Sequence, residues 1–69
     1  MMDEQLERTM KTFFYDPAGW STHEIYQEYL TICKEDKVEP RPKSVVIREV
    51  CKEFNCDLKE VKTKYFIRD

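Results

Sequence analysis

The sequence is poor in the residues on which most enzyme chemistry depends. It has one glycine and one histidine in 69 residues. A single glycine excludes the glycine-rich loops that hold phosphate through the backbone. His23 has no serine or cysteine partner at a spacing typical of a nucleophile and its base. So short a chain also has little room to shield a reaction from water. We therefore expect a protein that is not an enzyme.

Long hydrophobic runs and a disulfide framework are missing too. No apolar stretch approaches the roughly 20 residues that a membrane span needs, and the acidic start MMDEQLERTM is unlike a secretory signal. The expected location is the cytoplasm. Three cysteines without a C-x-x-C pair predict reduced thiols. The spacing of Cys33, Cys51 and Cys56 with His23 matches no zinc pattern, so we expect no metal and no cofactor.

What the chain does contain is enough for one small core. Apolar residues make up 41% of the sequence and aromatic residues 13%, and the 38% of charged residues are of mixed sign. This composition favours a folded chain over a disordered one. The length predicts a single domain, which spans residues 1–69. A domain of this size buries only roughly 60% of its unfolded surface, so its core is small.

Two amphipathic helices are predicted in the first half. Apolar residues recur at helical spacing over about residues 2–15, and the turn sequence DPAG follows. A second helix over residues 21–36 has a clear start, because Ser21 and Glu24 have the spacing of a capping box. Its broad apolar stripe consists of Ile25, Tyr26, Tyr29, Leu30 and Cys33.

A third helix and a strand element are predicted in the second half. The helix covers residues 43–55 after the proline-stiffened connector VEPRP, and Asn55 is a suitable left-handed stop. Its apolar face consists of Val46, Ile47, Val50, Cys51 and Phe54. The tail changes to a period of two, which predicts a strand over about residues 60–68. Its partner is either the stretch around residues 58–61, in a hairpin, or an extended piece near the connector.

These elements predict a mainly α fold with a minor β part. Three helices followed by a short basic C-terminal strand or hairpin form a small winged-helix-like domain. The charge is divided between the halves of the chain. Residues 1–36 carry three basic and eight acidic side chains, a net charge of −5, and residues 37–69 carry nine basic and six acidic ones, a net charge of +3. The basic half indicates an anionic partner, although two solvated surfaces of mixed charge give the same split.

Basic side chains of the second half are the candidate nucleic-acid contacts. A helix that binds DNA needs polar side chains on an exposed face and cations for phosphate. The third helix, its entrance and the tail supply this set: Arg41, Lys43, Ser44, Arg48, Lys52, Lys62 and Lys64. Glu49 and Glu53 on the same half of the helix weaken the positive potential. The alternative is a helix face that is only solvated.

The aromatic residues suggest a second kind of surface. Most of them are needed for the core of so small a domain. If the first helix does not fold back fully, Phe13, Phe14 and Tyr15 form an exposed patch. Such patches mark protein partners. This favours an alternative function, a small protein–protein adaptor or inhibitor that binds a replication or regulatory enzyme and has no DNA affinity of its own.

The segment IYQEYLTICKEDKVEPRPKSVVIREVCKEF resembles the small C-terminal winged-helix domain of phage, plasmid and poxvirus-type primase-helicases. That family has a helix with two tyrosines and a late cysteine, then a proline-containing entry to a helix with an arginine, and a basic β-wing. The corresponding residues here are Tyr26, Tyr29, Cys33, Pro42, Ser44, Arg48, Lys62 and Lys64. The resemblance covers about residues 20–68.

This resemblance implies an accessory module of mobile-element DNA replication, which binds DNA or docks a protein partner. Two features depart from the family. The sequence has no glycine after Gly19 for the tip of a wing, so we expect a short wing or none. It also has no ATPase motif, so we expect a free-standing relative or an isolated module.

Overall fold

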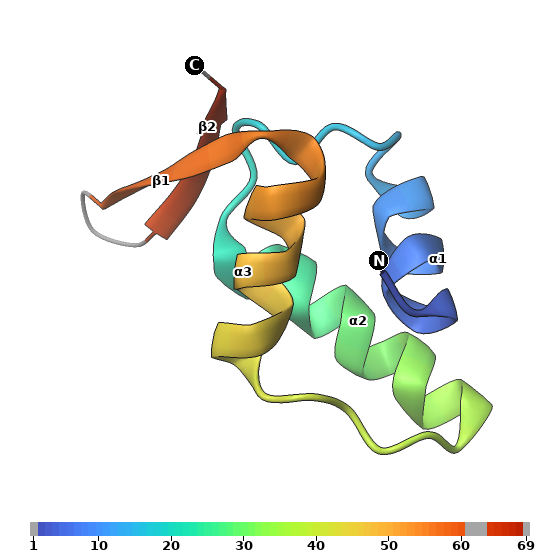
Figure 1. The fold of residues 1–69 in the computed structure, drawn as a ribbon. Helices are drawn as coiled ribbons and strands as arrows, with labels where there is room; N and C mark the ends of the chain where they lie inside the picture. Colours follow the sequence, from blue (N-terminus) through green and yellow to red (C-terminus); the bar gives the residue numbers. More distant parts are fainter. Residues whose placement is uncertain (1, 61–63, 69) are drawn as a thin grey trace.

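The computed structural model describes residues 2–60 and 64–68, which form three helices and a two-stranded antiparallel hairpin (Figure 1). In chain order the elements are α1 (Glu4–Thr12), α2 (Thr22–Asp36), α3 (Lys43–Phe54), β1 (Cys56–Glu60) and β2 (Lys64–Arg68). The predicted fold class, a small mainly α domain of three helices followed by a short C-terminal strand or hairpin, is confirmed. None of the described helices combines the length and the apolar character needed to cross a bilayer.

The C-terminal strand pairs in a hairpin, which is the first of the two predicted arrangements. β1 and β2 are antiparallel, from Cys56 opposite Arg68 to Glu60 opposite Lys64. The one strand predicted over about residues 60–68 is therefore the returning half of a hairpin that already begins at Cys56. The turn between the strands, residues 61–63, lies outside the described residues and includes the predicted contact Lys62.

The hairpin is joined to the start of α2 by backbone hydrogen bonds. The Gly19 N–H donates to the Phe66 carbonyl at 2.9 Å, and the Phe66 N–H donates to the Trp20 carbonyl at 3.0 Å. Ser21 and Tyr65 form an antiparallel bridge beside them. Because this short extended segment pairs with β2, the position of the hairpin relative to the helices is set by sheet hydrogen bonds as well as by side-chain packing.

The ends of α2 and α3 lie close to the predicted ones, whereas α1 starts later than predicted. Ser21 and Glu24 form the predicted capping box. Asn55 takes the predicted left-handed conformation after α3, with φ of 50°. The first helix was predicted from residue 2. It begins after Asp3, because the Asp3 carboxylate accepts a hydrogen bond from the Leu6 N–H at 2.7 Å and caps the helix.

α1 also ends three residues before the predicted residue 15. Phe14 and Tyr15 have left-handed φ angles of 57° and 56° and stop the helix. The Phe14 N–H donates to the Lys11 carbonyl at 3.0 Å, and the Tyr15 N–H donates to the Met10 carbonyl at 2.8 Å. This is the hydrogen-bond pattern of a Schellman closure, in which Phe14 holds the position that glycine usually occupies.

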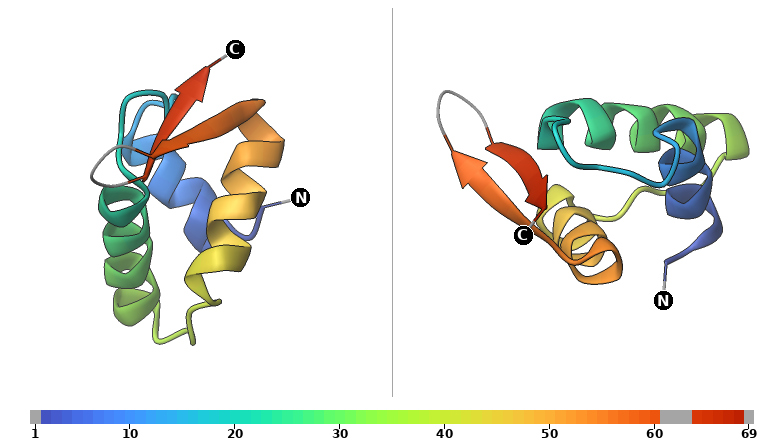
Figure 2. Two further views of the ribbon diagram at one scale, coloured as in Figure 1. Left: turned by 90° about the vertical axis from the view of Figure 1, so that its left-hand side faces the viewer. Right: turned by 90° about the horizontal axis from the view of Figure 1, so that it is seen from above.

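The core lies where the three helices meet the inner face of the hairpin. Its buried residues come from all five elements: Leu6, Met10, Ile25, Tyr29, Cys33, Val46, Ile47, Val50, Cys56 and Phe66. Phe66 is completely buried. Figure 2 shows α2 and α3 in the middle of the molecule, with α1 on one side of them and the hairpin on the other.

Candidate nucleic-acid interface

An open groove lies between α3 and the hairpin. Its lining residues are Thr22 of α2, Lys43, Ser44, Ile47, Arg48 and Cys51 of α3, and Cys56, Asp57, Leu58 and Lys64 of the hairpin. The α3 residues 44, 47, 48 and 51 are three and four positions apart, so they share one face of the helix. The lining combines apolar side chains with polar ones, and its charged side chains are mostly cationic.

Three cations from two elements meet in this groove. Lys43 and Arg48 come from α3, and Lys64 comes from β2. All three side chains are exposed. One carboxylate, Asp57, also lines the groove. The lining therefore carries a net positive charge, and its cations approach any ligand from both sides of the groove.

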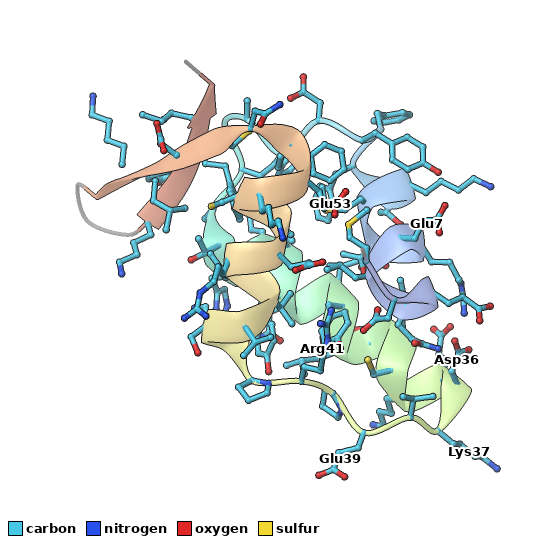
Figure 3. All side chains as sticks on the ribbon, in the orientation of Figure 1. Glu7, Asp36, Lys37, Glu39, Arg41 and Glu53 are labelled. Carbon is cyan, nitrogen blue, oxygen red and sulfur yellow. The ribbon has the colours of Figure 1, made fainter. Side chains whose placement is uncertain are left out.

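Arg41 has a different position from the one the sequence suggested. Its Nε lies 2.9 Å from Oδ2 of Asp3, at the start of α1. Its backbone N–H donates to the Tyr29 hydroxyl at 3.2 Å, and its carbonyl accepts from the Tyr26 hydroxyl at 2.9 Å. Figure 3 shows Arg41 on the connector below α3, on the far side from the hairpin. These contacts hold the proline-rich connector against α1 and α2, and Arg41 does not line the groove.

Lys52, the fourth predicted contact on α3, is exposed but lies outside the groove lining as well. The two glutamates expected to weaken the positive potential do not line the groove either. Glu49 is half-buried and acts electrostatically on Arg41. Glu53 lies on the side of α3 that faces α1 (Figure 3). The carboxylates of α3 are thus directed toward the first helix more than toward the groove.

The hairpin contributes residues that sequence analysis missed. Asp57 and Leu58 of β1 line the groove, but the pattern around them gave no clear strand. A useful signal was available at Asn55, the predicted helix stop. A strand that starts directly after that stop, and pairs with the period-two tail, brings Leu58 opposite Phe66.

The exposed aromatic patch, expected if the first helix did not fold back fully, is present in part although α1 packs on the core through Leu6 and Met10. Phe14 is 87% exposed and Tyr15 is 48% exposed. Phe13 is half-buried and packs edge-on against Trp20, with 4.8 Å between the ring centroids. We call Phe13, Phe14, Tyr15 and Trp20 the aromatic corner. It lies at the end of α1 and in the connection to α2.

The thiols and the histidine form no cluster suited to a metal ion. Within residues 2–60 and 64–68, no three side chains of the metal-ligating types gather. Cys33 and Cys56 are buried, and Cys51 is half-buried in the groove. Burial raises the pKa of the Cys51 thiol, and Cys56 and Asp57 raise it further. Cys51 is therefore a protonated thiol at neutral pH.

Comparison of the chain with protein-family models, curated proteins and solved structures finds no match. The resemblance to primase-helicase winged-helix domains therefore stays a prediction. Function has to be inferred from the groove and from the aromatic corner.

Proposed function

We propose that this chain is a non-enzymatic DNA-binding module, which holds the sugar–phosphate backbone of DNA in the groove between α3 and the hairpin. The observation that supports this is the convergence of Lys43, Arg48 and Lys64 from two elements on one groove. Phosphate neutralisation supplies most of the sequence-independent affinity of DNA-binding proteins. Ser44 and Arg48 lie on the same helix face and are also side-chain types that contact base edges.

The proposed setting is DNA replication of a phage-like or plasmid-like mobile element, with the chain as an accessory module. This setting comes from the resemblance to primase-helicase domains. A cytoplasmic location is part of the proposal, because all three cysteines are thiols and thiols stay reduced in that compartment. The proposed activity needs no cofactor and no small-molecule substrate.

The experiment is fluorescence-anisotropy binding to labelled single- and double-stranded DNA at two salt concentrations. With three phosphates neutralised, affinity for the duplex should fall about 40-fold between about 50 and about 200 mM salt. The variant Arg48→Ala/Lys64→Ala keeps one groove cation. Its affinity should be weaker at low salt and should fall only about 3- to 4-fold over the same range.

A second double variant controls for total charge. Lys11→Ala/Lys34→Ala removes the same charge from exposed positions on α1 and α2. It should bind DNA like the wild type if the groove is the site. Equal weakening by both double variants would show a response to net charge alone, and no binding by the wild type at low salt would refute DNA binding.

The exposure of the aromatic corner favours a second candidate function. An adaptor or inhibitor that binds a replication or regulatory enzyme would use Phe13, Phe14 and Tyr15 and would have no DNA affinity. The 87% exposed Phe14 ring is the observation in its favour. A folded wild-type protein that fails to bind DNA at low salt would make this the better explanation.

A further inference from the structure

Phe14 occupies a position that neither backbone preference nor core packing explains. Its φ of 57° is left-handed, a conformation in which a β-carbon is crowded and glycine is preferred. Its ring is 87% exposed, so it adds little to the core. Local strain of this kind is retained where function needs the side chain. The ring is therefore a candidate contact for another molecule.

The first helix, which precedes the ring, carries charges of both signs, and its two glutamates outnumber the one cation that no carboxylate of α2 binds. Glu4, Glu7 and Tyr15 line a shallow hollow on α1, together with Arg8 and Lys11. The Arg8 guanidinium in this hollow is bound by Asp36. The whole first half of the chain carries a net charge of −5. An exposed aromatic ring on this net negative half of the chain is complementary to a depression that is apolar inside and cationic at its edges.

The groove between α3 and the hairpin is such a depression. Ile47, Cys51 and Leu58 supply apolar surface, and Leu58 is 38% exposed. Lys43, Arg48 and Lys64 supply the positive charge. We propose that the groove of one copy of this chain binds the aromatic corner of a second copy, with Phe14 against the apolar lining and the acidic residues of α1 near the groove cations.

The arrangement of the two surfaces determines the kind of assembly. α1 and the hairpin lie on opposite sides of α2 and α3 (Figures 1 and 2). Trp20, at the other end of the corner, lies beside β2, but Phe14 at the end of α1 does not reach the groove of its own chain. For the same reason two copies do not close into a reciprocal dimer. The contact is head to tail, and each added copy offers a new corner or a new groove.

The contact is also weak and sensitive to salt. One ring with its neighbours buries much less than the roughly 1,200 Å² of a stable interface, so association appears only at high protein concentration. The charges on both surfaces are solvent-exposed, and added salt screens them. DNA and the corner of a second copy use the same groove, so they exclude each other. The self-association itself does not require that the chain bind DNA.

Sedimentation velocity of the full chain, from about 20 µM to about 1 mM, tests the contact, because small interfaces associate in this range. The weight-average sedimentation coefficient of the wild type should rise with concentration at low salt and should stay at the monomer value at high salt. Phe14→Gly removes the ring and relieves the backbone strain, so it keeps the fold. Arg48→Glu/Lys64→Glu reverses charge in the groove. Each variant alone should remain monomeric.

A mixture of the two variants gives the sharpest result. Phe14→Gly has an intact groove but lacks the Phe14 ring of the corner. The groove variant Arg48→Glu/Lys64→Glu has an intact corner. An equimolar mixture should form a dimer and nothing larger, because neither end of that dimer can add a copy. Val38→Ser is the matched control, since Val38 is 42% exposed and lies outside both surfaces. It should associate like the wild type.

A wild type that stays monomeric up to about 1 mM would overturn the proposal. So would continued association of Phe14→Gly, or a mixture of the two variants that stays monomeric. DNA binding is measured separately on Phe14→Gly, whose groove is intact. If the association data agree with the proposal and no DNA is bound, only the proposed function fails; if DNA is bound and the association fails, only the head-to-tail contact is wrong.

Discussion

The left-handed backbone at Phe14 leads to a prediction about stability. A non-glycine residue in this conformation costs about 1–2 kcal/mol. Phe14 has φ of 57° and closes α1 through the hydrogen bonds of a Schellman motif. Phe14→Gly should relieve that cost, whereas Phe14→Ala should keep it. The comparison of the two variants isolates the backbone contribution, because both remove the same ring.

The magnitude follows from the two opposing effects of glycine. Glycine gives back about 0.5–1 kcal/mol through its greater freedom in the unfolded chain. The Gly variant should therefore be more stable than the Ala variant by about 0.5–1 kcal/mol. Because Phe14 is 87% exposed, little of its ring is buried, and removing the ring lowers the free energy of unfolding by about 0.6 kcal/mol at most. The Gly variant should thus lie near the wild type, and the Ala variant should lie below it.

Thermal unfolding followed by circular dichroism measures this difference. For a domain of this size, 0.5–1 kcal/mol corresponds to about 2–8 °C in Tm. Thr12, the last residue of α1, provides the control. There the order should reverse, with Thr12→Gly less stable than Thr12→Ala, because the position is helical. A Phe14→Gly variant less stable than Phe14→Ala would refute the left-handed closure.

Three further predictions concern single side chains. Arg41→Ala should lower the free energy of unfolding, measured in urea, by about 1 kcal/mol, because the contact with Asp3 is lost. The folded variant should still bind DNA like the wild type in the anisotropy assay. Unchanged stability would contradict the structural role of Arg41. The hydrogen bond from Arg8 holds the pKa of Asp36 below its ordinary value of 3.8. The ion pair therefore stabilises the fold at neutral pH, and this contribution is lost as the pH falls below 3.8 and through the lowered pKa. The Tm deficit of Asp36→Asn should stay constant from about pH 7 to about pH 5 and should shrink below about pH 4. A deficit that does not shrink in acid would argue against the pair. Cys51 should react slowly with iodoacetamide at neutral pH, because the pKa of its thiol is raised. In a time course followed by mass spectrometry, bound duplex DNA should slow this reaction further. Equal reaction rates with and without DNA would show that DNA binds outside the groove.

The three helices were predictable because each has its own local signals. Apolar residues recur at helical spacing, and Ser21 with Glu24 and Asn55 set helix ends through hydrogen bonds within a few residues. The end of α1 was not predictable in the same way. Phe14 and Tyr15 adopt a conformation that favours glycine, and the DPAG turn just after them is the stronger breaker in the sequence.

The hairpin and the face of its second strand depend on contacts distant in sequence. The period of two predicted a strand, but Phe66 shares a side of that strand with Lys64 and was not identified as a core residue. Its burial follows from the pairing of β2 with both β1 and the segment at Gly19 and Trp20. The sequence offered the hairpin as one of two possible pairings and gave no signal for the pairing with Gly19 and Trp20, so the inner face of β2 could be assigned only in the folded chain.

The candidate site was likewise predictable only where it depends on local spacing. Lys43, Ser44 and Arg48 lie within two turns of one helix, so their spacing alone predicted that they act together. Lys64 joins them because the hairpin folds back beside α3. Arg41 was predicted to belong to this group but does not line the groove, because it pairs with Asp3 near the start of the chain. Local spacing therefore predicted the α3 residues of the groove but also included Lys52, which lies outside the lining. Tertiary contacts decided which other cations belong to the site.

Taken together, the two proposals predict that only one chain of each head-to-tail assembly contacts the DNA directly. A copy whose groove holds DNA keeps Phe14 of its aromatic corner exposed, because α1, which ends just before Phe14, and the hairpin lie on opposite sides of the molecule (Figure 2). It can therefore hold one copy from solution, and that copy has its groove filled and cannot bind DNA. At high protein concentration the wild type should load more than one chain per DNA site, so its complex should have a larger mass in sedimentation than that of Phe14→Gly. Its apparent DNA affinity should be lower than that of Phe14→Gly, because some of its grooves hold the corner of another copy. Equal complex masses for the two proteins would show that the corner and the groove do not act together on DNA.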